Sequence, residues 1–138
     1  MLVNINPALW GKPYWDMMHY VTLAYPENPL EDDKQNINDF FSSINNVIPC
    51  HTCRANFKDH LKKYPLDEHA LLSRNNLIQW LVNIHNEVNR LTHKPNITQQ
   101  DVEKQYLYST KPQSYTTLIT IILLILLVII IIIYVKYR

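Results

Sequence analysis

The C-terminal run LITIILLILLVIIIIIYV, residues 118–135, contains no charged side chain. As an α-helix it would be ~27 Å long, close to the ~30 Å thickness of the hydrocarbon core of a bilayer. Because lipid offers no hydrogen bonds, a chain inside it must satisfy its own backbone groups, which favours a helix. We therefore predict a transmembrane helix over residues 118–135, with a buried core helix as the alternative. Residues typical of a membrane interface lie at its two ends: Tyr115, Tyr134, Lys136, Tyr137 and Arg138.

The N-terminal sequence MLVNINPALW is too polar for a signal peptide. The C-terminal segment would therefore leave the ribosome last, as in a tail-anchored protein. We expect a soluble domain over residues 1–112 on the cytosolic side of a membrane. Residues 113–138 would form a single-pass anchor.

The composition narrows what the soluble domain can be. A single glycine argues against a glycine-rich phosphate loop or a dinucleotide fingerprint. It also disfavours folds that are rich in tight hairpins. The formal net charge of +1 gives no electrostatic preference for nucleic acid, and we expect no nucleic-acid partner.

Helical spacing of apolar residues dominates the soluble part. Asn6 and Pro7 resemble a helix start, and Thr98 with Asp101 resembles the start of a short last helix that ends near Tyr108. A third helix would run from about Cys50 to Tyr64. No stretch alternates as a strand would, so we predict an all-α fold, a four-helix bundle plus a short fifth helix. The expected core positions are Trp10, Tyr14, Met17 or Met18 and Val21; Ile37, Phe40, Phe41, Ile44 and Val47; Cys53, Phe57, Leu61 and Tyr64; and Leu77, Leu81, Ile84, Val88 and Leu91.

The chain has two cysteines, Cys50 and Cys53, in the sequence CHTC. The pair could supply half of a zinc site, but the six histidines lack the close spacing of a second ligand pair. Haem attachment requires CxxCH, and Arg54 follows Cys53 instead. A buried structural pair is a further alternative.

A redox dithiol has physical support. Cys50 falls at the expected start of the third helix, where free backbone N–H groups and the helix dipole favour a thiolate. Arg54 lies one turn further along and adds positive charge. Such a pair can accept two electrons only once unless it passes them on.

The fourth predicted helix carries a polar strip beside its apolar face. His85 and Asn89 are four residues apart, and so are Asn86 and Arg90. The strip could be an ordinary solvated face. In the same way, Trp15 and His19 on the first helix could be core aromatic residues with a satisfied histidine.

Together, three stretches resemble the Erv/ALR sulfhydryl oxidases. WGKPYWDMMH is similar to the family opening W-G-x-x-x-W-x-x-x-H, CHTC to its redox pair, and HNEVNRLTHKP to its H-N-x-V-N signature. The resemblance covers Trp10 to about Tyr108. It implies a four-helix bundle plus a fifth helix, usually dimeric, that binds FAD at the mouth of the bundle.

The resemblance also implies roles for particular residues. A substrate thiolate would attack Cys50, and the released Cys53 thiolate would reduce the flavin, which molecular oxygen reoxidises to give hydrogen peroxide. From its place at the helix start, we expect Cys50 to be solvent-accessible and Cys53 to point toward the bundle. The positions that match cofactor contacts of the family are Gly11, Trp15, His19, His85, Asn86, Val88, Asn89, Arg90, Lys94 and Tyr106.

The chain departs from many cellular members of this family. It lacks both the structural disulfides and the second, shuttling CxxC pair. In this it resembles the minimal oxidases of large DNA viruses, which act on a dedicated thiol protein. The expected partners are therefore a protein dithiol, O₂ and a membrane, either of the host or of a virion. The alternative is a tail-anchored zinc-binding adaptor or interaction module.

Overall fold

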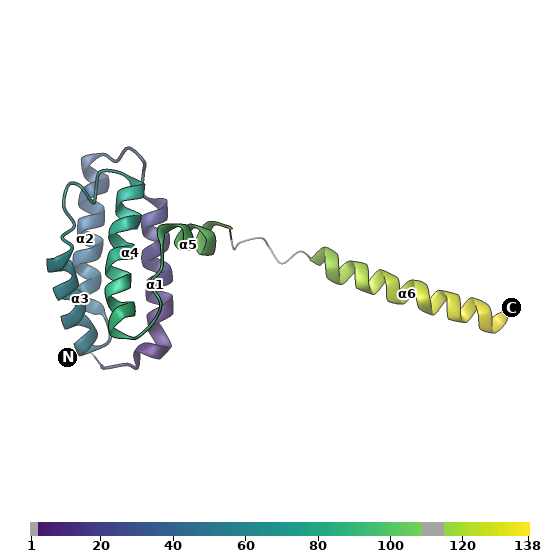
Figure 1. Ribbon diagram of the computed structural model, residues 1–138. Helices are drawn as coiled ribbons and strands as arrows, with labels where there is room; N and C mark the ends of the chain where they lie inside the picture. Colours follow the sequence, from purple (N-terminus) through teal and green to yellow (C-terminus); the bar gives the residue numbers. More distant parts are fainter. Residues whose placement is uncertain (1–2, 109–114) are drawn as a thin grey trace. The chain divides into compact units, whose positions relative to one another are not determined.

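The computed structural model describes residues 3–108 and 115–138, and the chain divides into two compact units, Met1–Tyr108 and Ser109–Arg138 (Figure 1). The described part contains helices and no strands, which confirms the all-α prediction. The helices are α1 (Pro7–Ala24), α2 (Glu31–Val47), α3 (His51–Lys63), α4 (Arg74–Leu91), α5 (Gln99–Glu103), a π-helical turn η1 (Lys104–Tyr108) and α6 (Tyr115–Tyr137).

The bundle is formed by α1 to α4, and α4 packs against both α1 and α3 (Figure 1). Leu77, Leu81 and Ile84 on α4 are completely buried, as their spacing predicts. Leu91 is the last member of this row by its spacing, but it is 47% exposed. Val47 is similarly 52% exposed at the end of α2. Both residues are the last of their helices, where the apolar period continues but the neighbouring helices no longer cover it.

Caps fix the helix ends that the sequence predicts. The Asn6 side chain accepts a hydrogen bond of 3.0 Å from Ala8 N–H at the start of α1. Thr98 and Asp101 form a capping box at the start of α5. The predicted fifth helix is in fact two short elements, because the chain passes from α-helical to π-helical geometry at Lys104.

The helix α6 contains an apolar stretch, Ile119–Tyr137, that is long and apolar enough to cross a membrane, with a mean hydropathy of 3.2. This stretch overlaps the predicted span of residues 118–135. The predicted boundary between residues 112 and 113 lies outside the described residues.

The core of the bundle depends on the buried row of α4. We predict that Leu81→Ala lowers the free energy of unfolding by about 2–5 kcal/mol, because it leaves a cavity in the middle of the bundle. Leu91→Ala removes the same atoms from an exposed position and should change the stability by less than about 0.5 kcal/mol. Urea unfolding followed by tryptophan fluorescence measures both. Equal losses for the two variants would contradict this packing.

Candidate functional site

Aromatic rings from α1 and α4 meet at the centre of the candidate site. Trp15 and His85 stack with ring centroids 3.8 Å apart and an interplanar angle of 2°. His19, one turn after Trp15, forms a hydrogen bond of 2.9 Å between its Nε2 and Nδ1 of His85. The structure therefore brings together three of the residues that the sequence singled out, across 66 residues of chain.

The turn η1 closes one side of this cluster. The Tyr106 ring stacks on His19 with centroids 5.1 Å apart. Its hydroxyl donates a hydrogen bond of 2.8 Å to Asp16, which also forms an ion pair with Lys12 at 2.5 Å. We refer to Trp15, His19, His85 and Tyr106 as the ring cluster. Sequence reasoning missed Asp16, for which the only signal was the four-residue spacing from Lys12.

Burial sets the protonation of the ring cluster. It lowers the pKa of His19 to about 4, against the opposing effect of the Asp16 carboxylate. It lowers the pKa of His85 to about 3, and the neighbouring His19 and Lys94 lower it further. Both rings are therefore neutral near neutral pH. One of the two rings donates the hydrogen of the bond between His19 Nε2 and His85 Nδ1, and the other accepts it. The buried Nδ1 of His19 has no hydrogen-bond partner among the described residues. Burial and the Asp16 carboxylate together raise the pKa of Tyr106.

The other candidate residues of α4 have different surroundings. The Asn86 side chain holds the backbone of Ile97 through hydrogen bonds of 2.8 and 2.9 Å, so its amide positions the loop before α5. Asn89 is buried, and Val88 is half-buried. Arg90 forms an ion pair of 2.8 Å with Glu87. Hydrogen bonds from Lys63, Arg90 and Tyr64 lower the pKa of Glu87 to about 2.

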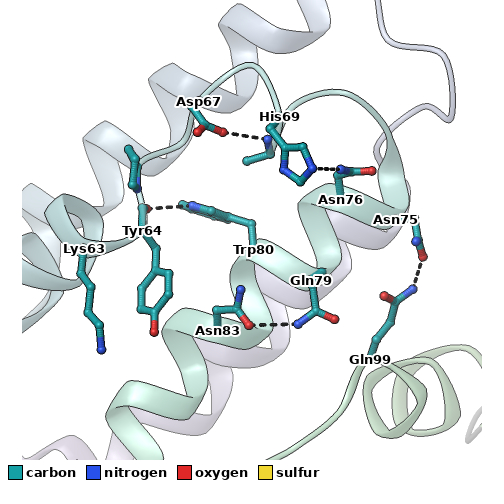
Figure 2. A pocket seen from close by; sticks show the side chains of 12 residues that line it. Lys63, Tyr64, Asp67, His69, Asn75, Asn76, Gln79, Trp80, Asn83 and Gln99 are labelled. Carbon is teal, nitrogen blue, oxygen red and sulfur yellow. Dashed lines mark hydrogen bonds between the residues drawn. The ribbon is translucent and has the colours of Figure 1, made fainter.

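Two cavities lie along α4. One, of about 370 Å³, is lined by Asn86, Arg90 and Lys94 among others. The other, of about 350 Å³, is lined mainly by residues of α4 and of the segment before it, and by none of the predicted site residues; among them are Tyr64, Asn75, Asn76, Gln79, Trp80 and Asn83 (Figure 2). The two cavities share Tyr64 and Asn83 in their linings.

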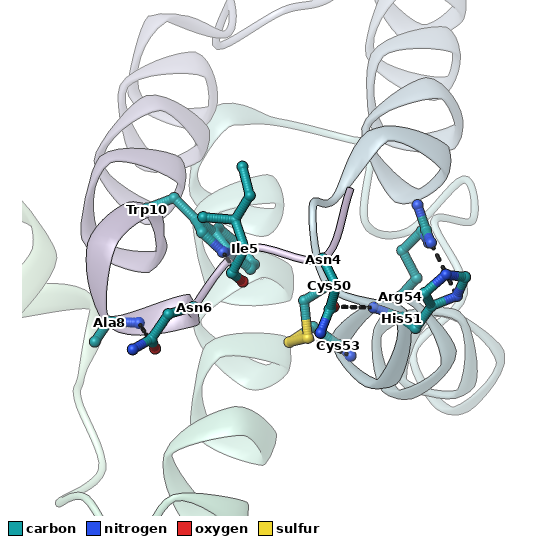
Figure 3. The surroundings of a disulfide bond; sticks show 9 residues. All are labelled: Asn4, Ile5, Asn6, Ala8, Trp10, Cys50, His51, Cys53 and Arg54. Atoms are coloured by element: carbon teal, nitrogen blue, oxygen red, sulfur yellow. Dashed lines mark hydrogen bonds between the residues drawn. A yellow bond between two sulfur atoms is a disulfide. The ribbon is translucent and has the colours of Figure 1, made fainter. Parts of the chain in front are cut away.

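Cys50 and Cys53 form a disulfide at the start of α3 (Figure 3). Cys50 is the N-cap, and its Sγ accepts a hydrogen bond of 3.1 Å from Cys53 N–H. The predicted solvent access of Cys50 is wrong: the residue is only 7% exposed, whereas Cys53 is half-buried. Cys50 belongs to the hydrophobic core, and the N-terminal residues hydrogen-bond to the backbone on both sides of it, at Pro49 and His51.

The disulfide and the ring cluster border the same core. Cys53 and Trp15 both pack against the buried residues of the bundle, although no hydrogen bond joins the disulfide to the ring cluster within residues 3–108. Gly11, one turn before Trp15, has nothing within 4 Å of where a Cβ would stand. The site thus combines a redox-capable disulfide with an uncharged aromatic surface, in which His19 and Tyr106 are buried and Trp15 and His85 are half-buried.

The structure is thus an all-α bundle with a CxxC disulfide at a helix start, an arrangement suited to thiol–disulfide exchange, and comparison with known proteins makes the assignment specific. Residues 12–107 match the Erv1 / Alr family. The chain belongs to this family.

Relatives of the chain are known from viruses and plants. It is 47% identical over 94 residues to a probable FAD-linked sulfhydryl oxidase of Acanthamoeba polyphaga mimivirus, covering 68% of this chain and 66% of the relative. It is 30% identical over 80 residues to an FAD-linked sulfhydryl oxidase of Arabidopsis thaliana, covering 58% of this chain and 40% of the relative. The chain thus spans less than two thirds of both relatives.

Solved structures show the same fold. The crystal structure of the yeast Erv1 core superimposes with a TM-score of 0.67 at 24% identity, covering 76% of this chain and 86% of that one. The FAD binding domain of Erv1 from Saccharomyces cerevisiae gives a TM-score of 0.68, also at 24% identity, covering 75% and 95% of the two chains. At this identity the likeness establishes the fold alone.

The neutral histidines make a prediction about stability and pH. In the folded protein their pKa values lie below the 6.5 of an ordinary histidine. As the pH falls, the unfolded chain therefore binds more protons than the folded chain does. The free energy of unfolding therefore has its full value above about pH 6.5. It decreases as the pH falls toward the pKa values of the two histidines in the folded protein. We expect the free energy of unfolding to drop by about 1–2 kcal/mol per histidine between about pH 7 and pH 5.

Urea unfolding followed by tryptophan fluorescence measures this loss. The three tryptophans all lie in α1 and α4 and therefore report on the bundle. The slope of the unfolding free energy against pH should be smaller in His85→Phe than in wild type. It should be unchanged in His69→Gln, which alters an exposed histidine. A wild-type stability that does not change over this pH range would show that the two rings are not held neutral.

Proposed function

We propose that the chain is an FAD-dependent sulfhydryl oxidase that introduces disulfide bonds into partner proteins. The observation that carries the proposal is the position of the Cys50–Cys53 disulfide against the same core as the ring cluster. Membership of the Erv1 / Alr family supports it, because the family match spans both features.

The residues of the site fit a flavin dinucleotide. Trp15 and His85 offer flat rings for stacking, and the unpartnered Nδ1 of His19 offers a buried polar atom. The open space at Gly11 leaves room for a ligand beside α1, and Arg90 and Lys94 supply positive charge for phosphate groups. The residues proposed to hold FAD are Gly11, Trp15, His19, His85, Asn86, Val88, Asn89, Arg90, Lys94 and Tyr106.

Bound FAD would take up the two electrons of the reduced cysteine pair and pass them to O₂, giving H₂O₂. The chain's own cysteines exchange electrons with the substrate. A substrate thiolate attacks Cys50 Sγ, a mixed disulfide forms, and Cys53 leaves as a thiolate. A second substrate thiol then releases the oxidised substrate and leaves Cys50 and Cys53 reduced. The backbone N–H that points at Cys50 Sγ favours a thiolate at this helix start.

Further parts of the proposal concern the setting of the enzyme. The apolar helix α6 would anchor it in a host or virion membrane, with the catalytic unit on the cytosolic side and Lys136 and Arg138 at the far end of the span. The enzyme would act as a homodimer on a protein dithiol, as the family resemblance implies. The alternative of a zinc-binding adaptor is not favoured, because Cys50 and Cys53 are bonded to each other and the chain belongs to an oxidase family.

The cofactor can be detected directly. A chain that ends before Leu118 should stay in aqueous buffer and purify yellow, with the absorption bands of FAD, because the described helices of the bundle end at Tyr108. The full chain in detergent is the control and should carry the same amount of flavin. A full chain that is colourless and takes up no added FAD would overturn the proposed function. Flavin in the full chain alone would show instead that α6 contributes to its binding.

The two cysteines should differ in their effect on the flavin spectrum. Cys50→Ser leaves Cys53 as a lone thiolate, which we expect to lie against oxidised FAD and to give a broad long-wavelength absorption band. Cys53→Ser should give no such band. Both variants should keep FAD and lose turnover with a protein dithiol. A band in Cys53→Ser alone would reverse the two roles, and near-normal turnover in either variant would exclude the dithiol mechanism.

A further inference from the structure

The N-terminal residues 3–6, which we call the strap, lie beside Cys50 at the start of α3 (Figure 3). Ile5 N–H donates to the Pro49 carbonyl at 2.7 Å. His51 N–H donates to Asn4 Oδ1 at 3.1 Å. Trp10 Nε1 donates to the Ile5 carbonyl at 3.0 Å, which ties the strap to α1. Two backbone groups that flank Cys50 are thus both occupied by the strap.

These two backbone groups have the arrangement of one parallel β-bridge. In such a bridge, a residue donates its N–H to the carbonyl before the residue opposite it and accepts from the N–H after it. Cys50 is itself extended, with φ −153° and ψ 121°. Pro49 C=O and His51 N–H could therefore both pair with a single extended residue opposite Cys50. The strap satisfies only the first through its backbone and uses the Asn4 side chain for the second.

We propose that the strap occupies the place of the substrate, and that an extended polypeptide segment docks its cysteine opposite Cys50 through Pro49 C=O and His51 N–H. This inference rests on the proposed function and names the class of its substrate. Docking places the substrate thiolate next to Cys50 Sγ. The new S–S bond forms there while the Cys50–Cys53 bond breaks, and the electron pair leaves on Cys53 Sγ.

The positions of Pro49 C=O and His51 N–H also restrict the kind of segment that can bind. Recognition uses backbone groups, and the strap side chains Asn4 and Ile5 are themselves exposed. Docking therefore selects an unfolded or flexible segment with a free N–H and C=O at its cysteine, and places little demand on its other side chains. The strap must leave first, so it slows attack on Cys50 by every thiol.

Release of the strap can be tested with a matched pair. Ile5→Pro removes the N–H that bonds Pro49, whereas Ile5→Ala keeps it. The probe is 2-mercaptoethanol, and the readout is the anaerobic rate at which the Cys50–Cys53 disulfide is lost, followed by mass after an acid quench and maleimide labelling. Ile5→Pro should react about 3-fold faster or more, the effect of one lost hydrogen bond. Ile5→Ala should match wild type.

Docking can be tested at His51. Proline is favoured at the first position of a helix, so His51→Pro keeps α3 while removing the N–H, and His51→Ala keeps the N–H. The probes are 2-mercaptoethanol and a blocked tripeptide with a central cysteine. The ratio of the peptide rate to the 2-mercaptoethanol rate should fall about 3- to 10-fold in His51→Pro. The ratio should be unchanged in His51→Ala. A change in the reduction potential of the Cys50–Cys53 disulfide affects both rates alike and therefore cancels in the ratio.

Three results would overturn the inference: equal rates for the two Ile5 variants, an unchanged ratio in His51→Pro with native helical content, or attachment of the probe to Cys53. If His51→Pro does not fold, the Ile5 pair decides alone. The readout needs neither flavin nor oxygen. A protein that binds no FAD would therefore overturn the proposed oxidase function and leave this test undisturbed. A protein that binds FAD but shows equal rates for the two Ile5 variants would overturn the inference and leave the proposed function intact.

Discussion

The hydrogen bond between His19 and His85 is the contact on which the candidate site depends. It joins α1 to α4, and each ring is stacked on a further aromatic side chain, Trp15 or Tyr106. Buried polar rings are tolerable only when they are neutral and hydrogen-bonded. The same burial that keeps both histidines uncharged therefore creates an apolar, aromatic surface beside the core that α3 and its disulfide also border.

The helices of the bundle could be predicted from the sequence because their signals are local. Apolar spacing gives the buried face of α4, and side-chain caps at Asn6 and Thr98 set two helix starts. The same reasoning fails at Val47 and Leu91, because a periodic pattern does not say where the neighbouring helices end. It also gave no sign of the change to π-helical geometry at Lys104.

The candidate site was only partly visible in the sequence. Motif spacing pointed to Trp15, His19 and His85, and the structure brings these rings together. It did not point to Asp16, whose partner Tyr106 is 90 residues away, or to the use of Asn86 as a clamp on Ile97. Nor did it predict the hydrogen bonds of Asn4 and Ile5 to the backbone on both sides of Cys50. Such contacts depend on the packing of distant segments, which leaves no periodic trace in the sequence.

If the ring cluster holds FAD, as proposed, His85→Ala should bind FAD more weakly. The measurement is the FAD dissociation constant of this variant, followed by flavin fluorescence on protein whose helical content matches that of wild type. His69→Ala, which alters an exposed histidine between α3 and α4, is the matched control. We expect the FAD affinity to be at least about 10-fold weaker in His85→Ala, a loss of about 1.4 kcal/mol, and to equal that of wild type in the control. Wild-type affinity in His85→Ala would contradict the proposed role of the ring cluster.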